Sequence, residues 1–357
     1  WILYQKNYSE RFEIQFNYNH KMVKINRFSV APMMDLTDRH CRYFHRILSK
    51  NALLYTEMVT SKAILYGNTR QLLKFDPMEK PLALQVGGSD PIELAEVASI
   101  AEELGFDEIN LNVGCPSSRV KSGMFGAVLM KDPKLVCRCI EQMKNAVNNI
   151  PVSVKCRIGV DNQDPKVILP NFVSSVSKAG ADYFIIHARK ALLSGLSPKQ
   201  NRKIPPLDYA VVDSVKKSFP DISICLNGGI TSLAVAKELL DKTFNGVMLG
   251  RASYYYPEEI LLKVDSLIYG SGKSKTMFQA VSELLPYIEK ELDTGSRLSE
   301  ITRHLMRAFV GHRGARQYRK HLTENSFRKE AKAGVFVEAL SIIENENSRN
   351  LCMDTLI

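Results

Sequence analysis

Short, nearly continuous apolar runs recur along residues 27–270 and alternate with amphipathic segments of helical spacing. Runs of this length are typical of strands that are buried on both faces of a parallel sheet. The pattern predicts eight strands, at residues 28–32, 53–58, 81–86, 108–113, 151–156, 182–187, 222–227 and 246–250. Helices are expected between them, including residues 37–48, with Thr37 or Asp38 near the N-cap, and residues 91–104.

The number of strand–helix units indicates the fold class. Eight units in roughly 240 residues match the count and length of a TIM (β/α)8 barrel. A doubly wound sheet usually has fewer units and a Gly-rich turn after its first strand. Here the first turn reads Pro-Met-Met-Asp-Leu-Thr, at residues 32–37, and lacks that feature. We therefore predict an α/β protein built on a TIM barrel.

The pattern changes after residue 272, where helical spacing continues without further strand candidates. Helices are expected at residues 277–292, 298–309 and 327–344. We predict a small all-helical C-terminal domain, residues 275–345, joined to a barrel domain, residues 27–270, by the Gly-Ser-Gly-Lys linker at 270–273. Residues 1–26 are interpreted as an N-terminal extension and residues 346–357 as a tail.

Composition excludes several classes of protein. Apolar residues make up 45% of the chain, enough for a full core, and no apolar run approaches the ~18 residues of a membrane span. The seven cysteines are an odd number, and Cys137 and Cys139 lie two apart without a second pair. This disfavours a disulfide framework and a metal site and favours a reducing, cytoplasmic compartment. The first 20 residues lack the apolar segment of a signal peptide.

Positive charge is concentrated near the C-terminus. The net charge is +10, and residues 303–332 contain nine Lys or Arg against two Glu. A local excess of this size indicates a polyanionic partner, whereas the alternative is an ordinary solvated helix face.

Polar or Gly-rich residues follow nearly every predicted strand, where a parallel barrel places its chemistry. The Gly-rich turns after the seventh and eighth strands are typical of a phosphate site. A lysine and a histidine at strand ends suit a ring that becomes anionic on reduction, and a glutamine suits a pyrimidine-like edge. Together these residues describe a site for flavin mononucleotide (FMN): Pro32, Met33, Met34, Gln85, Lys155, His187, Asn227, Gly228, Gly229, Gly250 and Arg251.

One thiol, Cys115, lies in a Gly-Cys-Pro turn after the fourth strand. From its position alone this thiol is a candidate nucleophile, metal ligand or proton donor. An ordinary thiol has a pKa of about 8.5 and is mostly protonated at neutral pH, which suits proton donation.

Several strings resemble the tRNA-dihydrouridine synthase family, and within it the bacterial A type. The resemblance extends from about residue 27 to about residue 322 and rests on the segments at residues 30–35, 37–44, 54–58, 83–90, 108–117, 185–191, 193–199, 204–209 and 227–230. Three positions depart from the pattern of the A type: Leu36 and Leu192 replace aromatic residues, and Cys156 replaces a threonine.

The resemblance implies an oxidoreductase that uses FMN, with NADPH as reductant, to reduce the carbon 5–carbon 6 double bond of uridines 20 and 20a in the tRNA D-loop. It assigns Cys115 as the donor of a proton to carbon 5 and the strand-end residues above as FMN contacts. It places Asn112 near the uridine, and Lys199, Arg202, Arg316 and Arg319 against tRNA. We expect a monomer with no bound metal and no membrane contact.

Two other functions stay open. A flavin barrel acting on a free pyrimidine, as in dihydroorotate dehydrogenases, leaves the basic C-terminal domain without a role. A non-catalytic tRNA-binding protein on the same fold is disfavoured by the intact set of cofactor residues.

Overall fold

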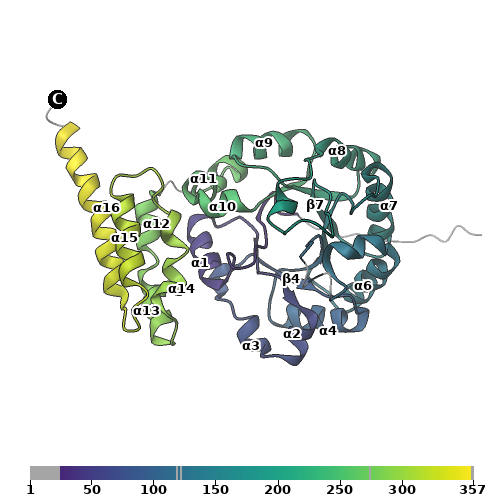
Figure 1. The fold of residues 1–357 in the computed structure, drawn as a ribbon, viewed down its shortest axis with the longest axis horizontal. Coiled ribbons are helices and arrows are strands. Elements are labelled where there is room, and N and C mark those ends of the chain that lie inside the picture. Colours follow the sequence, from purple (N-terminus) through teal and green to yellow (C-terminus); the bar gives the residue numbers. More distant parts are fainter. Residues whose placement is uncertain (1–24, 118–119, 121–122, 273–274, 355–357) are drawn as a thin grey trace, which may run out of the picture.

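In the computed structural model, residues 25–117, 120, 123–272 and 275–354 are described, so most of the predicted extension and Lys273 of the predicted linker lie outside this part. Parallel strands form one sheet that curls into a barrel (Figure 1). The strands are β1 (Phe28–Val30), β2 (Leu54–Tyr55), β3 (Val59–Thr60), β4 (Leu82–Gly87), β5 (Glu108–Val113), β6 (Val152–Arg157), β7 (Tyr183–His187), β8 (Ser223–Asn227) and β9 (Gly246–Leu249).

The strands pair in the order β1-β9-β8-β7-β6-β5-β4-β2, and β3 pairs with the end of β4. The ring closes between β1 and β2, where the Val30 amide donates to the Leu53 carbonyl at 2.9 Å. The predicted TIM barrel is therefore confirmed.

The predicted second strand at 53–58 is wrong in its extent, because β2 stops at Tyr55 and pairing resumes in β3. The hydroxyl of Thr56 accepts a hydrogen bond from the backbone N–H of Gln85 at 3.1 Å, and so replaces a backbone carbonyl in the ladder.

Helices surround the barrel, and several begin at an acidic cap followed by proline. Asp90-Pro91, Asp132-Pro133 and Asp164-Pro165 each start a helix, because the carboxylate accepts backbone N–H groups and proline suits the first turn. The helices are α1 (Arg39–Leu48), α2 (Ser61–Tyr66), α3 (Thr69–Leu72), α4 (Pro91–Glu103), α6 (Pro133–Asn145), α7 (Pro165–Lys178), α8 (Tyr209–Ser218), α9 (Leu233–Lys242), α10 (Arg251–Tyr255) and α11 (Pro257–Tyr269).

Strand β5 shows how the barrel separates its two sides. Ile109, Leu111 and Val113 belong to the large core between the strands and the helices. The alternate residues of β5 are polar, and all six residues of the strand are buried. Since successive side chains of a strand point to opposite faces, the polar set of β5 points into the barrel. The interior is therefore polar along this strand, although a small apolar cluster that includes Tyr55 and Tyr183 fills part of it.

The C-terminal helices α12 (Met277–Ser282), α13 (Leu285–Asp293), α14 (Leu298–Thr302), α15 (Ala315–Asn325) and α16 (Ala333–Asp354) lie together on one side of the barrel, near α1, α10 and α11 (Figure 1). Contacts from α1 hold them there. Arg39 pairs with Glu291 at 2.5 Å, and Asp38 accepts from Arg303 at 2.8 Å and from His304 at 2.9 Å.

The boundaries of these helices differ from the predicted ones. The predicted helix 277–292 is broken before Pro286, which has no N–H to continue the α12 ladder. The predicted helix 298–309 ends at Thr302 and is followed by the 3-10 turn η4 (Leu305–Arg307). The last helix begins at Ala333 rather than at residue 327, and it continues past residue 345.

Candidate active site

The turn that carries Cys115 is held by a side chain of the preceding strand. The Oδ1 atom of Asn112 accepts the backbone N–H groups of Gly114 at 3.1 Å and Cys115 at 2.9 Å. The carbonyl of Cys115 accepts the Ala127 amide at 2.9 Å. These three bonds hold the half-buried Cys115 at the carboxyl end of β5, where a (β/α)8 barrel carries out its chemistry.

Lys155 of β6 lies inside the barrel next to Asn227 of β8. Its Nζ atom donates to Asn227 Oδ1 at 3.0 Å, and Asn227 Nδ2 donates to the Met248 carbonyl at 2.7 Å. Burial, and then the nearby Arg157, lower the pKa of Lys155 to about 8. In the described part of the chain, Asn227 is the one acceptor of this ammonium, which leaves two of its three N–H donors for a ligand.

Cations gather around His187 at the end of β7. Burial holds the pKa of His187 well below its usual range, and the charges of Arg157, Lys155, Arg189 and Arg202 lower that pKa further. The imidazole is therefore neutral at neutral pH. Among the described residues, none of these four cations has a carboxylate within 4.0 Å. The cluster lacks a protein counter-ion and therefore suits an anionic ligand.

The glycines after β8 allow a close approach of the backbone. A Cβ atom on Gly228 would lie 2.5 Å from His187 Cδ2, and one on Gly229 would lie 2.3 Å from Leu207 Cδ1. Both glycines also have positive φ angles, +108° and +72°. The Tyr209 hydroxyl donates to the Gly228 carbonyl and steadies the turn. Only glycine fits this path, as a phosphate-binding turn requires.

The structure brings most of the predicted cofactor residues together through direct contacts. Gln85 accepts from Asn112, Lys155 donates to Asn227, Gly228 lies against His187, and a Cβ on Gly250 would lie 3.3 Å from Met33 Sδ. Pro32 and Met34 occupy the same turn as Met33, with Met34 mostly exposed. Arg251 begins α10, which has only five residues.

The predicted tRNA contacts divide into two groups. Lys199 precedes the short 3-10 helix η3 (Gln200–Arg202) in the loop after β7, and Arg202 is the last residue of that helix. Burial lowers the pKa of Arg202, and the charge of Arg251 lowers it further while Cys115 opposes the shift. Arg202 is therefore close enough to both residues to interact with them, whereas Lys199 is exposed.

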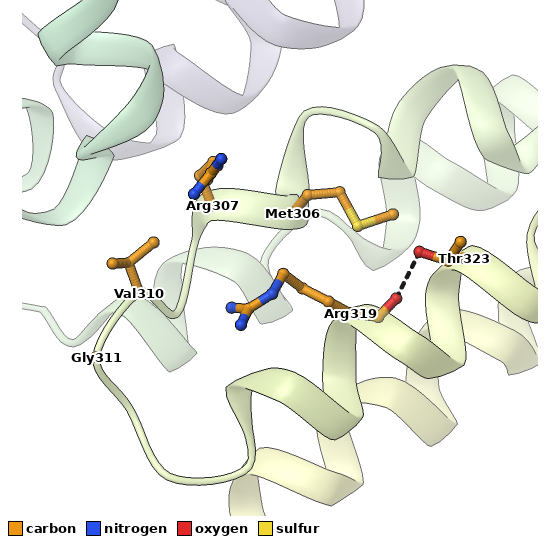
Figure 2. A pocket seen from close by; sticks show the side chains of 6 residues that line it. All are labelled: Met306, Arg307, Val310, Gly311, Arg319 and Thr323. Carbon is orange, nitrogen blue, oxygen red and sulfur yellow. Dashed lines mark hydrogen bonds between the residues drawn. The ribbon is translucent and has the colours of Figure 1, made fainter.

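The second group lies on α15, where Arg316 and Arg319 flank the fully buried Tyr318. A cavity of about 410 Å³ opens between α15 and η4, and Figure 2 shows the residues that line it: Met306, Arg307, Val310, Gly311, Arg319 and Thr323. Arg319 lines this cavity and Arg316 does not. The guanidinium of Arg307 lies 5.4 Å above the ring of Tyr255 in α10, so the cavity adjoins the barrel.

Three cations of the site were missing from the predicted set: Arg157, Arg189 and Arg307. Arg157 lies two residues after Lys155 on the same strand, so the period of two could have placed both on the inner face. Its Nε atom donates to the Gly114 carbonyl at 3.2 Å, beside Cys115. Arg307 gave no comparable signal, because its partner Tyr255 is distant in sequence.

Two further findings limit the kind of site. Among the residues that the structure describes, no three His, Cys, Asp or Glu side chains gather as a metal site would require. In the same part of the chain, none of the helices is long and apolar enough to cross a membrane.

A closed ring of eight parallel strands with its polar residues at the carboxyl ends defines a (β/α)8-barrel protein. A solved structure of 2-naphthoyl-CoA reductase with 2-naphthoyl-CoA shares this fold, with a TM-score of 0.50, 10% identity, and 68% of this chain and 50% of that chain covered. The sequence model of the family described as "Dihydrouridine synthase (Dus)" matches residues 29–344. The chain belongs to the dihydrouridine synthase family, so the predicted resemblance is confirmed.

Relatives of known name agree with this assignment. The tRNA-dihydrouridine(20/20a) synthase of Salmonella typhi is 52% identical over 322 residues, which cover 90% of this chain and 96% of the relative. The enzyme of the same name from Escherichia coli K12 is 52% identical over 322 residues, covering 90% and 92%. That from Vibrio cholerae is 51% identical over 319 residues, covering 89% and 96%.

Proposed function

We propose that this protein reduces the carbon 5–carbon 6 double bond of uridines 20 and 20a in the D-loop of tRNA. The observation that carries the proposal is the identity of about half of all residues, over nearly the whole length, to enzymes named tRNA-dihydrouridine(20/20a) synthase. The site adds support of its own, because it combines a thiol, an anion-binding cluster and spare N–H donors at one end of a barrel.

The residues at the strand ends fit FMN. Among the residues that the structure describes, the cations around His187 have no carboxylate counter-ion, and they suit the phosphate of FMN and the anionic edge of its reduced ring. The turn at Gly228 and Gly229 allows backbone N–H groups to approach that phosphate. Lys155 and Gln85 each retain an N–H donor for the ring edge. When bound, FMN supplies the hydride for carbon 6 of uracil, with NADPH as the reductant.

The chain's own residues hold the proton and the charge. Lys155 is protonated below a pH of about 8 and stabilises negative charge on a ring beside it. The turn at Asn112 keeps the Cys115 thiol at the barrel mouth, and this thiol donates its proton to carbon 5 of the uracil. The neutral His187 adds an N–H donor and no charge.

A path of cations supports tRNA as the substrate. Arg202 and Arg251 lie at the barrel mouth, Arg307 stacks on Tyr255, and Arg319 lines the cavity beyond it. A uridine in folded RNA has to leave its stack to reach a barrel interior, and phosphate contacts on both sides would hold the RNA while it does so. A free pyrimidine would leave this cavity without a role.

The test is a mass map of dihydrouridine in tRNA from cells with and without this protein. In tRNA from cells without the protein, we expect positions 20 and 20a to lack dihydrouridine and the other dihydrouridine positions to keep it. An unchanged map at both positions refutes the proposed function. A purified protein whose NADPH oxidation is stimulated by dihydroorotate and not by tRNA would instead support the free-pyrimidine alternative.

We also propose that the protein acts as a monomer in the cytoplasm. The absence of a long apolar helix in the described residues and the tRNA substrate of the named relatives support this location. Light scattering at micromolar concentration tests the monomer, and a dimer mass would refute it. Cell fractionation tests the location.

A further inference from the structure

A chain of side-chain hydrogen bonds leaves the active site and enters the barrel. It starts at the backbone N–H of Cys115, which donates to Asn112 Oδ1 at 2.9 Å. Asn112 Nδ2 donates to Gln85 Oε1 at 2.8 Å, and Gln85 Nε2 donates to Asn110 Oδ1 at 2.7 Å. Asn110 Nδ2 then donates to Ser153 Oγ at 2.7 Å. Apart from the Cys115 turn, every member is buried.

The chain ends on a buried carboxyl group. Ser153 Oγ donates to Oε1 of Glu108, which also accepts from the Tyr55 hydroxyl at 2.6 Å. Tyr183 donates to Oε2 of the same carboxyl, and the two tyrosine hydroxyls lie 3.0 Å apart. Glu108 is only 3% exposed and lies at the amino end of β5, far along the strand from Cys115.

Both ends of this chain demand the same direction of donation. A backbone N–H can only donate, so the atom of Asn112 that faces the turn is its oxygen. A carboxylate can only accept, so the Ser153 hydrogen points to Glu108. Starting from either end, each amide in between is then oriented in one way, with no link left mismatched.

We propose that Glu108 is a positioning residue. From the inner end of the chain its buried carboxyl keeps the Gln85 amide in the orientation that matches Asn112, so that both amides present N–H donors to the bound ligand. The inference rests on the proposed function, because it assigns those amides to a flavin and a uracil ring. In this orientation each amide nitrogen has one N–H engaged in the chain and one N–H left over. The mouth of the barrel therefore presents donors, which suit carbonyl oxygens on a ring edge, rather than acceptors.

The link to Ser153 is the same whether Glu108 carries a proton or not. In the ionised form, Oε1 accepts from Ser153 and Tyr55, and Oε2 accepts from Tyr183. In the neutral form, a proton on Oε2 is donated to Tyr183, which turns its hydrogen to Tyr55, and Oε1 still accepts from Ser153. A glutamine at this position reproduces the neutral form, with its nitrogen in place of Oε2.

Removal of the Ser153 hydroxyl would leave one mismatch in the chain. In Ser153→Ala the mismatch sits at the Asn110 nitrogen, or moves along the chain when Asn110, Gln85 or both amides rotate. Each rotated arrangement places two amide nitrogens against each other. In wild type it also turns the Asn110 oxygen toward the Ser153 oxygen, so loss of the hydroxyl removes one of these two penalties and raises the population of the arrangements that misplace Gln85. A ligand that needs the correct arrangement then binds about three- to tenfold more weakly, in proportion to the lost population.

The experiment compares two variants that each remove one hydroxyl from Glu108. Ser153→Ala breaks the chain, whereas Tyr183→Phe removes a donor to the other carboxyl oxygen and leaves the chain whole. FMN is titrated into each apoprotein by fluorescence quenching, and the melting temperature of each apoprotein is recorded. We expect Ser153→Ala to raise the Kd about three- to tenfold, and Tyr183→Phe and Glu108→Gln to stay within about twofold of wild type. Glu108→Leu, a second break in the chain, should match Ser153→Ala.

The outcomes separate the inference from the proposed function. If wild type binds FMN and the Kd of Ser153→Ala equals that of Tyr183→Phe, the positioning role is overturned and the network is merely structural. The same conclusion follows if the Kd of all variants only tracks their melting temperatures. If wild type binds no FMN, the proposed function fails and the inference fails with it.

Discussion

Glu108 should make the stability of this protein fall as pH rises through 7, and Glu108→Gln should remove that dependence. Burial raises the pKa of this carboxyl from 4.5 to about 7, against the opposing hydrogen bonds from Ser153, Tyr183 and Tyr55. The folded state therefore holds the proton more tightly than the unfolded state. The stabilisation is fully present below pH 4.5 and is lost as pH rises through about 7.

The size of this effect follows from the two pKa values. Their difference of about 2.5 corresponds to about 3 kcal/mol, at roughly 1.36 kcal/mol for each pKa unit. Because other groups also titrate, the quantity to measure is the difference in unfolding free energy between wild type and Glu108→Gln. Between pH 4.5 and 8, wild type should lose about 3 kcal/mol of unfolding free energy relative to Glu108→Gln.

The assay is urea unfolding followed by circular dichroism at half-unit steps of pH. As a control, Glu238→Gln makes the same change at a carboxyl of α9 that is 59% exposed, and it should keep the pH dependence of wild type. A difference between wild type and Glu108→Gln that stays flat from pH 4.5 to 8 would refute the reasoning. It would mean that Glu108 ionises as if it were in water.

Three other predictions concern the active site and the RNA surface. Cys115→Ala should keep FMN and tRNA binding but lose most dihydrouridine formation, measured by single-turnover mass analysis. Cys137→Ala, which changes a half-buried thiol of α6, should keep dihydrouridine formation. Full turnover in Cys115→Ala would place the proton donor elsewhere. The Kd for FMN should be constant below pH 8 and rise above it, because Lys155 then loses its charge. Lys155→Met should abolish this rise in Kd. A rise that persists in Lys155→Met contradicts the assignment. Arg319→Ala should weaken tRNA binding and lower the slope of its salt dependence by about one. The effect should exceed that of Arg316→Ala, because Arg316 lies outside the cavity. Equal slopes for wild type and both variants would exclude α15 from the RNA interface.

Local signals in the sequence were enough for the architecture. The Asp-Pro pairs that start α4, α6 and α7 act within a few residues, so the pattern of strands and helices could be read without knowing their contacts. The predicted bounds failed where a side chain changed the backbone pairing, as Thr56 does at the end of β2. They failed again in the C-terminal region, where Pro286 interrupts the predicted helix 277–292 and a 3-10 turn replaces the end of the predicted helix 298–309.

The sequence also indicated where in the fold a candidate site would lie. Lys155 and His187 lie near the carboxyl ends of β6 and β7, and Gly228 follows β8 directly. In a parallel barrel these strand ends meet at one face. Arg157 was missed although it follows the same period as Lys155. Arg307 could not be found this way, since its contact with Tyr255 joins two segments that only the packing of the C-terminal helices brings together.

The alternation of polar and apolar residues in 108–113 shows the boundary between the two kinds of information. A period of two determines that Glu108, Asn110 and Asn112 share one face, and the Gly-Cys-Pro turn that follows determines where the thiol is placed. Which face turns inward was decided only when the ring of strands closed, because the apolar face was then needed against the helices. Closure also brought Ser153, Tyr55 and Tyr183 to the Glu108 carboxyl from other strands. Hydrogen bonds between residues so far apart in the chain depend on strand order and register, which no local pattern encodes.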